Sequence, residues 1–106
     1  MVERKQIESL VKRLVQAANP VRIVLFGSYA RGDARQDSDI DILVVEREVA
    51  SRRKEMVRLA REVASLRLPV DIIVTTEAAW REWRDTPGTI LYEAAREGRT
   101  VFEQAA

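Results

Sequence analysis

Residues 21–45 read VRIVLFGSYARGDARQDSDIDILVV, and they contain two apolar runs that are separated by a polar bend. The first run, residues 21–26, is rich in β-branched side chains and nearly all apolar, which is typical of a strand buried on both faces. Gly27 and Ser28 follow at once, and Ser28 is predicted to be the N-cap of a short helix. The second run, residues 39–45, alternates at its start and is apolar at its end, so it predicts a second strand.

Hydrophobic spacing and capping residues outside this stretch predict further elements. They are helices over residues 7–18, about 49–66, 76–83 and 86–98, and strands over residues 69–74 and 100–102. Helices and strands in this order favour an α/β (α+β) fold, in which helices pack on a small sheet of three or four strands. We expect residues 1–106 to form a single domain, because a chain of this length can enclose one hydrophobic core but not two. The pairing directions of the strands do not follow from the sequence.

The composition excludes several classes of chemistry. The chain has no cysteine and no histidine, which rules out disulfides, thiol nucleophiles, zinc sites of the Cys/His kind and a Ser-His-Asp triad. Its 18 Lys and Arg balance 17 Asp and Glu, so a net charge of +1 gives no bulk attraction to nucleic acid or to an anionic membrane. No apolar run is longer than four residues, and the first 20 residues contain no signal core. We therefore expect a cytoplasmic protein with no membrane association and no direct contact with nucleic acid.

Acid–base and metal chemistry must then fall mainly to carboxylates. Asp39 and Asp41 are two residues apart at the start of a strand, so their side chains share one face, roughly 7 Å apart. Like charges this close repel each other, and Mg²⁺, which binds one or two carboxylates together with substrate phosphates, would neutralise them. Asp71 stands near the start of another strand, in the same relation to an apolar run. If the two strands are neighbours, the three carboxylates converge at one end of the sheet.

Gly27 and Ser28 predict an anion site that complements these carboxylates. A strand that turns through glycine into a helix leaves free N–H groups, and a serine hydroxyl adds a further donor for phosphate. Phosphates held there, with a metal ion held by Asp39 and Asp41, would position a nucleoside triphosphate for in-line attack. Asp71 would bind a second metal ion or take the proton of the acceptor hydroxyl.

The spacing of these motifs resembles a known signature. Gly27-Ser28, then ten residues, then Asp39-Ile40-Asp41 resembles the signature of the DNA polymerase β-type nucleotidyltransferase superfamily. The longer string GSYARGDARQDSDIDILV, residues 27–44, is similar to that of its minimal branch, the MNT proteins. The resemblance runs over residues 21–74, about half of the chain. It implies a polymerase β-like nucleotidyltransferase fold, three catalytic and metal-binding carboxylates at Asp39, Asp41 and Asp71, and triphosphate contacts at Gly27 and Ser28.

The resemblance also implies a reaction and a partner. Minimal nucleotidyltransferases are commonly the antitoxins of MntA-like toxin–antitoxin modules, whose toxin is a helical HEPN-domain ribonuclease. The implied activity is Mg²⁺-dependent transfer of AMP from ATP to a hydroxyl, that of a tyrosine, on such a toxin within a hetero-oligomer. Larger relatives, such as the aminoglycoside nucleotidyltransferases, carry a helical domain that completes the substrate pocket. This chain is too short to include one, so we expect the partner to supply the other wall.

Several alternatives remain open at this point. The chain could be a non-catalytic antitoxin that neutralises the toxin by binding, or it could transfer nucleotides to a small molecule such as an antibiotic. A P-loop is excluded, because Asp33 stands where that motif requires lysine. Arg31 is expected to pair with Asp33 or Asp37 rather than with phosphate. Trp80 and Trp83 are expected to face the core or to be partly sheltered, with contact to a partner as the alternative.

Overall fold

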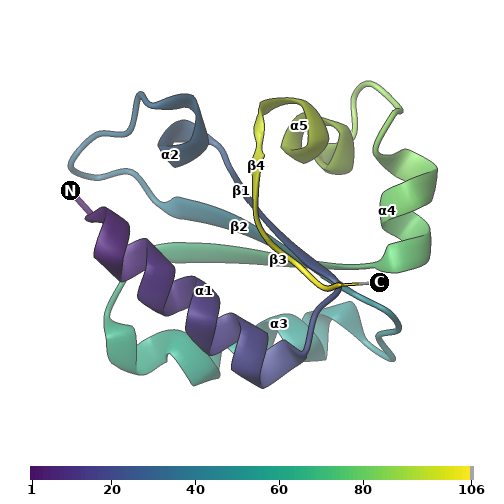
Figure 1. The fold of residues 1–106 in the computed structure, drawn as a ribbon, viewed down its shortest axis with the longest axis horizontal. Coiled ribbons are helices and arrows are strands. Elements are labelled where there is room, and N and C mark those ends of the chain that lie inside the picture. The colour runs from purple at the N-terminus through teal and green to yellow at the C-terminus, as the bar shows by residue number, and fades with distance from the viewer. Residues whose placement is uncertain (106) are drawn as a thin grey trace.

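The computed structural model describes residues 1–105, which form a four-stranded sheet with helices on both of its faces (Figure 1). The elements in chain order are α1 (Arg4–Ala18), β1 (Arg22–Phe26), α2 (Ser28–Arg31), β2 (Ile40–Glu46), α3 (Arg52–Val63), the 3₁₀ turn η1 (Ala64–Leu66), β3 (Val70–Thr76), α4 (Glu77–Trp83), α5 (Ile90–Glu97) and β4 (Arg99–Glu103). The predicted order of helices and strands is confirmed.

The sheet is mixed and has the strand order β3-β2-β1-β4. β1 is antiparallel to both of its neighbours, β2 and β4, whereas β2 and β3 are parallel. A parallel pair needs a crossover connection, and α3 provides it. This arrangement confirms the predicted fold class, and it brings the end of β1 beside the starts of β2 and β3.

The single sheet divides the buried hydrophobic residues into two clusters, one on each of its faces. Helices α1 and α3 lie together on one face of the sheet (Figure 1). They pack apolar side chains such as Leu10, Leu14 and Leu59 against the strands. On the other face, α4 and α5 contribute Trp80 and Leu91. Both helices of the first layer have one apolar stripe, which explains why each lies along the sheet rather than away from it.

Two predicted caps are confirmed, and one helix start was wrong. The Thr76 side chain accepts a hydrogen bond from the backbone N–H of Ala79 at 3.1 Å, so it caps α4 as predicted. The start predicted for α3 at about residue 49 was wrong, because Ser51 is the N-cap and its hydroxyl accepts from the N–H of Lys54. Gly98 ends α5, also as predicted.

The predicted start of α5 was wrong as well. We expected Thr86 to be the N-cap, but the helix begins at Ile90, and Thr89 accepts a hydrogen bond from the N–H of Tyr92 at 3.1 Å. Residues 86–89 read Thr-Pro-Gly-Thr, which suits a type II turn with proline second and glycine third. Gly88 has a φ of 91°, as the third position of that turn requires.

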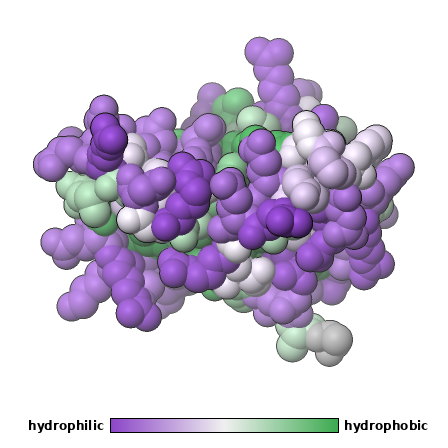
Figure 2. Space-filling view, turned by 90° about the horizontal axis from the view of Figure 1, so that it is seen from above, coloured by the Kyte–Doolittle hydropathy of each residue, from purple (hydrophilic) through white to green (hydrophobic). Residues whose placement is uncertain are grey.

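The two tryptophans of α4 differ in their surroundings. Trp80 is 4% exposed and belongs to the core, as predicted, whereas Trp83 is 44% exposed and is therefore only partly sheltered. Seen from the side of α2 and α5, the surface is largely hydrophilic (Figure 2). Within residues 1–105, no helix combines the length and the apolar character needed to cross a membrane.

Candidate active site

A cavity of about 450 Å³ lies where the end of β1 meets the starts of β2 and β3. All five residues that the sequence predicts as site residues line it: Gly27, Ser28, Asp39, Asp41 and Asp71. The far wall is made by α5, through Ile90, Glu93 and Glu97. The fold therefore brings the Gly27-Ser28 bend and the three aspartates, which lie apart in the sequence, to the same cavity.

The alternation of the strands puts the aspartates on one face. Asp41 in β2 is the register partner of Asp71 in the parallel neighbour β3. Leu43 and Val45, which follow Asp41 at intervals of two residues, belong to the core under α4 and α5. The carboxylate of Asp41 thus points to the side of the sheet that α5 covers. Asp39, two residues earlier, precedes the strand on the same side and lines the same cavity.

Gly27 brings the bend into direct contact with Asp41. Its φ of 71° is a left-handed conformation that favours glycine. A Cβ atom added at this position would overlap Oδ2 of Asp41 and would lie 3.0 Å from its Cγ. Phe26, the residue before the bend, is the register partner of Asp41 in the antiparallel pair. Only a residue without a side chain therefore allows this close approach.

The helix after the bend has a different cap from the one predicted. Gly27 is the N-cap of α2, and Ser28 is its first residue, so the expectation that Ser28 caps the helix was wrong. The carbonyl of Gly27 accepts hydrogen bonds from the N–H groups of Ala30 and Arg31, at 3.1 and 3.0 Å. The Ser28 side chain makes no cap hydrogen bond in this part of the structure, and the residue lines the cavity.

The electrostatics of the cavity centre on Asp41. Burial raises the pKa of its carboxyl, and the negative charges of Asp71 and Asp39 raise this pKa further. The guanidinium of Arg31 acts in the opposite direction and lowers the pKa of Asp41. The carboxylates of Asp39 and Asp71 therefore lie close enough to Asp41 for their charges to act on it. A cation placed between them would relieve that repulsion.

Arg31 carries positive charge at the edge of the cavity. Its Nε lies 3.3 Å from Oδ2 of Asp33, which confirms the predicted ion pair, and its Nη1 lies 3.6 Å from Oε1 of Glu97. The second pair connects α2 with α5, across the mouth of the site. All three side chains are more than 40% exposed, so each pair contributes at most about 1 kcal/mol to stability.

The donor set suits a hard divalent cation that is completed by other ligands. Among residues 1–105, no group of three acidic side chains is arranged to hold a metal ion on its own. Mg²⁺ commonly takes only one or two carboxylates and fills its other positions with phosphate oxygens and water. The carboxylate oxygens in the lining and the repulsion of Asp41 by Asp39 and Asp71 fit such an ion. Metal binding by Asp39, Asp41 and Asp71 stays a prediction.

Sequence reasoning missed the contribution of α5. Ile90, Glu93 and Glu97 are spaced i, i+3 and i+7, so they share one face of the helix, and this spacing was visible in the sequence. The spacing does not say which end of the sheet the helix crosses. That depends on how Leu91 and Ala94, on the adjacent face of the helix, pack into the core.

Comparison with known proteins assigns the family. A family model described as a nucleotidyltransferase domain matches residues 4–94, which include every predicted site residue. The chain belongs to this family. It is therefore an enzyme of the nucleotidyltransferase class.

Three of the proteins that this nucleotidyltransferase is similar to are a protein adenylyltransferase and two chains from toxin–antitoxin structures. Protein adenylyltransferase MntA of Thermococcus cleftensis is 37% identical over 78 residues, which are 70% of this chain and 79% of that protein. A chain in the crystal structure of a toxin–antitoxin with AMP-PNP is 25% identical, with a TM-score of 0.64, over 92% of this chain and 73% of that one. A chain of the tri-AMPylated Shewanella oneidensis HEPN toxin in complex with MNT antitoxin shares the fold, at 19% identity and a TM-score of 0.65, over 97% of this chain and 74% of that one.

Proposed function

We propose that this nucleotidyltransferase transfers AMP from ATP to a hydroxyl group, that of a tyrosine, on a partner protein, and that the partner is a HEPN-domain toxin that the transfer silences. The observation that carries the proposal is the shared cavity, in which three aspartates face the Gly27-Ser28 bend. The relatives support the choice of nucleotide and acceptor, because one is named as a protein adenylyltransferase and two belong to toxin–antitoxin structures.

Each part of the cavity has a role in this reaction. Gly27 lets a phosphate approach the backbone, and Ser28 offers a hydroxyl donor beside it. Asp39 and Asp41 would hold Mg²⁺, which when bound supplies positive charge against the phosphates. Arg31, at the edge of the same cavity, adds a cation whose ion pair with Glu97 keeps it in place.

The transfer itself is an in-line displacement at the α-phosphorus of ATP. The acceptor oxygen forms a bond to that phosphorus, and the bond from the phosphorus to the bridging oxygen of pyrophosphate breaks. The acceptor proton must leave as the oxygen attacks. Asp71 lines the cavity from the neighbouring strand and is exposed, so it is our candidate to take that proton or to bind a second metal ion.

The acceptor protein would complete the site. Asp39 and Asp71 are exposed, and α5 covers only one side of the cavity. In-line attack needs the acceptor hydroxyl to be held close to the α-phosphate, with bulk water excluded. A partner surface laid over the exposed aspartates would meet both requirements.

The proposal is tested by labelling. The purified protein is incubated with ATP labelled on the α-phosphate, Mg²⁺ and the product of the adjacent gene. We expect label on the partner, and we expect Asp41→Asn to reduce it by at least about 100-fold, since electrostatic groups in an active site are commonly worth that much. Asp85→Asn, which removes a carboxylate from an exposed loop outside the cavity, is the matched control. Failure of the wild type to label any partner over a range of metals and nucleotides would refute the catalytic proposal.

A second candidate function is neutralisation of the partner by binding alone. Two similar chains support it, because they come from structures of toxin–antitoxin complexes. If binding alone suffices, the double variant Asp39→Asn, Asp41→Asn will still protect cells that express the partner. If catalysis is required, the folded double variant will bind the partner and fail to protect.

A further inference from the structure

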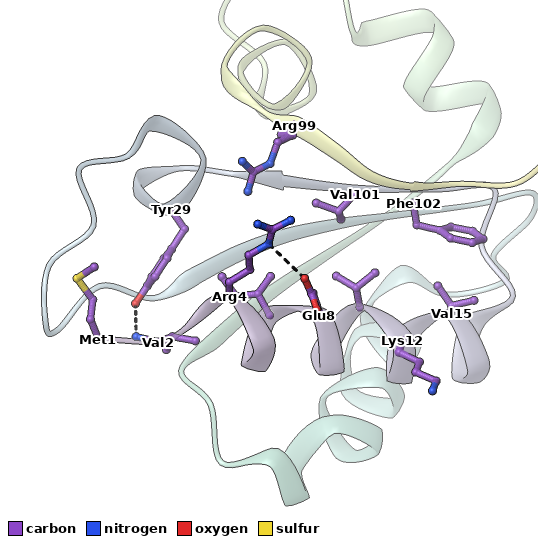
Figure 3. Close-up of a pocket in the computed structure, with 12 residues that line it drawn as sticks. Met1, Val2, Arg4, Glu8, Lys12, Val15, Tyr29, Arg99, Val101 and Phe102 are labelled. Atoms are coloured by element: carbon purple, nitrogen blue, oxygen red, sulfur yellow. Dashed lines mark hydrogen bonds and ion pairs between the residues drawn. The ribbon is translucent and has the colours of Figure 1, made fainter.

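A groove of about 850 Å³ runs between α1 and the edge strand β4, on the face of the sheet opposite α5 (Figure 3). It is larger than the cavity at the aspartates and contains none of the site residues. Its floor is apolar, and the residues that form it are Val2, Ile7, Val11, Val15, Tyr29, Val101 and Phe102.

The floor of the groove owes its width to an irregularity in β4. In the pairing with β1, Ile23 faces Phe102 and Val24 faces Thr100, so Val101 is an extra residue in a bulge. The bulge lets two consecutive apolar residues, Val101 and Phe102, both pack on the side of α1. In a regular strand one of them would point to the other face.

The rim of the groove is positively charged. Arg4, Lys12 and Arg99 contribute three cations, and Glu8, which pairs with Arg4 at 3.2 Å, contributes one anion, so the lining has a net charge of +2. The side chains of Arg4 and Glu8 are 92% and 64% exposed. Figure 3 shows Arg99 above the floor, whereas Lys12 projects from α1 on the side away from Val101 and Phe102. Two copies of this rim would repel each other, which disfavours a symmetric dimer through this face.

The groove adjoins the active site through the short helix α2. Tyr29 lines the groove, whereas its neighbour Ser28 lines the cavity of the aspartates. The hydroxyl of Tyr29 accepts a hydrogen bond from the N–H of Val2 at 3.1 Å, which ties the N-terminal segment to α2 (Figure 3). A molecule seated in the groove would therefore contact a residue adjacent to the Gly27-Ser28 bend.

We infer that this groove is a docking site for a segment of a partner protein that presents apolar side chains flanked by carboxylates. Apolar side chains would cover the floor, and Asp or Glu side chains would meet Lys12 and Arg99. This binding does not require nucleotide transfer, so it can be measured whether or not the proposed function holds.

The test uses a phage-displayed library of random peptides, sorted for binding to the full chain, and affinity measurements on the enriched peptides. The test variant is Lys12→Glu, Arg99→Glu, and the control is Arg53→Glu, Lys54→Glu, which makes the same charge change at exposed positions outside the groove. Because the chain has no cysteine, Glu8→Cys gives a single thiol for an environment-sensitive fluorophore in the groove.

We expect the enriched peptides to combine apolar residues with Asp or Glu. They should blue-shift the fluorophore and bind the test variant at least about tenfold more weakly, with the control unchanged. Basic or purely polar peptides, or equal weakening in both double variants, would overturn the inference. It would also be overturned by a dimer of the wild type that the test variant dissolves, or by binding to phosphatidylglycerol vesicles that only the test variant loses while no acidic peptide is enriched.

Discussion

Gly27 has a left-handed backbone conformation and lies against the carboxylate of Asp41, so it joins the two halves of the site. Gly27→Ala should destabilise the fold by roughly 1–3 kcal/mol through backbone strain, and it should also displace Asp41. Gly88→Ala is the matched control, because Gly88 has a similar φ of 91° but no atom within 4 Å of its added Cβ. Denaturant unfolding should show a loss for both variants, whereas AMP transfer should fall at least about 100-fold only for Gly27→Ala. Equal activity in the two variants would contradict the proposed contact.

Glu46, at the far end of β2 from the aspartates, gives a pH-dependent prediction. Burial raises the pKa of its carboxyl from 4.5 to about 8, helped by a side-chain hydrogen bond with Glu55 and by the charge of Glu55. The folded state then holds a proton that the unfolded state has released, so the free energy of unfolding should fall as the pH rises from about 4.5 to 8. Glu46→Gln, which stays neutral, should flatten this slope and be more stable than the wild type at pH 9.

The measurement is urea unfolding at intervals between pH 5 and pH 9, with the exposed Glu48→Gln as control. The pKa of Glu55, which neighbours Glu46, is shifted in the opposite direction. Its hydrogen bonds with Arg58, at 2.7 and 2.8 Å, lower the pKa of Glu55 to about 2, so the stability it contributes is lost only as the pH falls from 4.5 towards 2. If Glu46→Gln leaves the slope between pH 5 and pH 8 unchanged, the raised pKa of Glu46 is wrong.

Helix α5 forms one wall of the candidate site, so the N-cap that fixes the start of this helix also affects the cavity. The Thr89 hydroxyl accepts from the N–H of Tyr92 at 3.1 Å and donates to the carbonyl of Thr86 at 2.9 Å. Thr89→Ala should therefore cost about 1–2 kcal/mol of unfolding free energy. Thr86→Ala should cost less than half as much, since α5 is capped by Thr89 and not by Thr86. Thermal or urea unfolding measures the loss of stability in each variant. A larger loss for Thr86→Ala than for Thr89→Ala would support Thr86 as the N-cap, as the sequence predicts.

The elements also mark how far the sequence could predict this molecule. Alternation along β2 and β3 determines which side chains share a face, so the convergence of Asp39, Asp41 and Asp71 on one cavity could be predicted once the strands are neighbours. The sequence could not predict whether neighbouring strands pair in parallel or antiparallel, because the direction of pairing depends on how the α3 crossover packs. The predicted start of α5 was wrong for a local reason. Thr86-Pro87 suits the start of a helix and a type II turn equally well, and Gly88 with its positive φ favours the turn.

On the scale of the whole molecule, the two faces of the sheet carry two different cavities. Helices α5 and α1 lie on opposite faces of the sheet (Figure 1). The face under α5 holds the carboxylates, and the face under α1 holds the apolar groove. The four-residue helix α2 contributes to both, through Ser28 on one side and Tyr29 on the other. A small domain of this kind has room for a nucleotide and for a protein contact at the same time. The two can be tested separately, because they share no lining residue.

Nucleotide binding should stabilise the whole molecule, and this effect depends on the metal. A ligand that binds only the folded state adds about 1.4 kcal/mol at ten times its Kd, which for a domain of this size raises Tm by roughly 5–10 °C. We expect this rise with AMP-PNP and Mg²⁺ together, and much less with AMP-PNP and EDTA, because Asp41 already meets repulsion from Asp39 and Asp71 before any phosphate arrives. Differential scanning fluorimetry of the wild type and of Asp39→Asn, Asp41→Asn provides the comparison, with Asp85→Asn as control. An equal rise of Tm in the double variant would place the nucleotide away from the aspartates. A rise of Tm without metal would mean that Arg31 and the Gly27-Ser28 bend are enough to hold the phosphates.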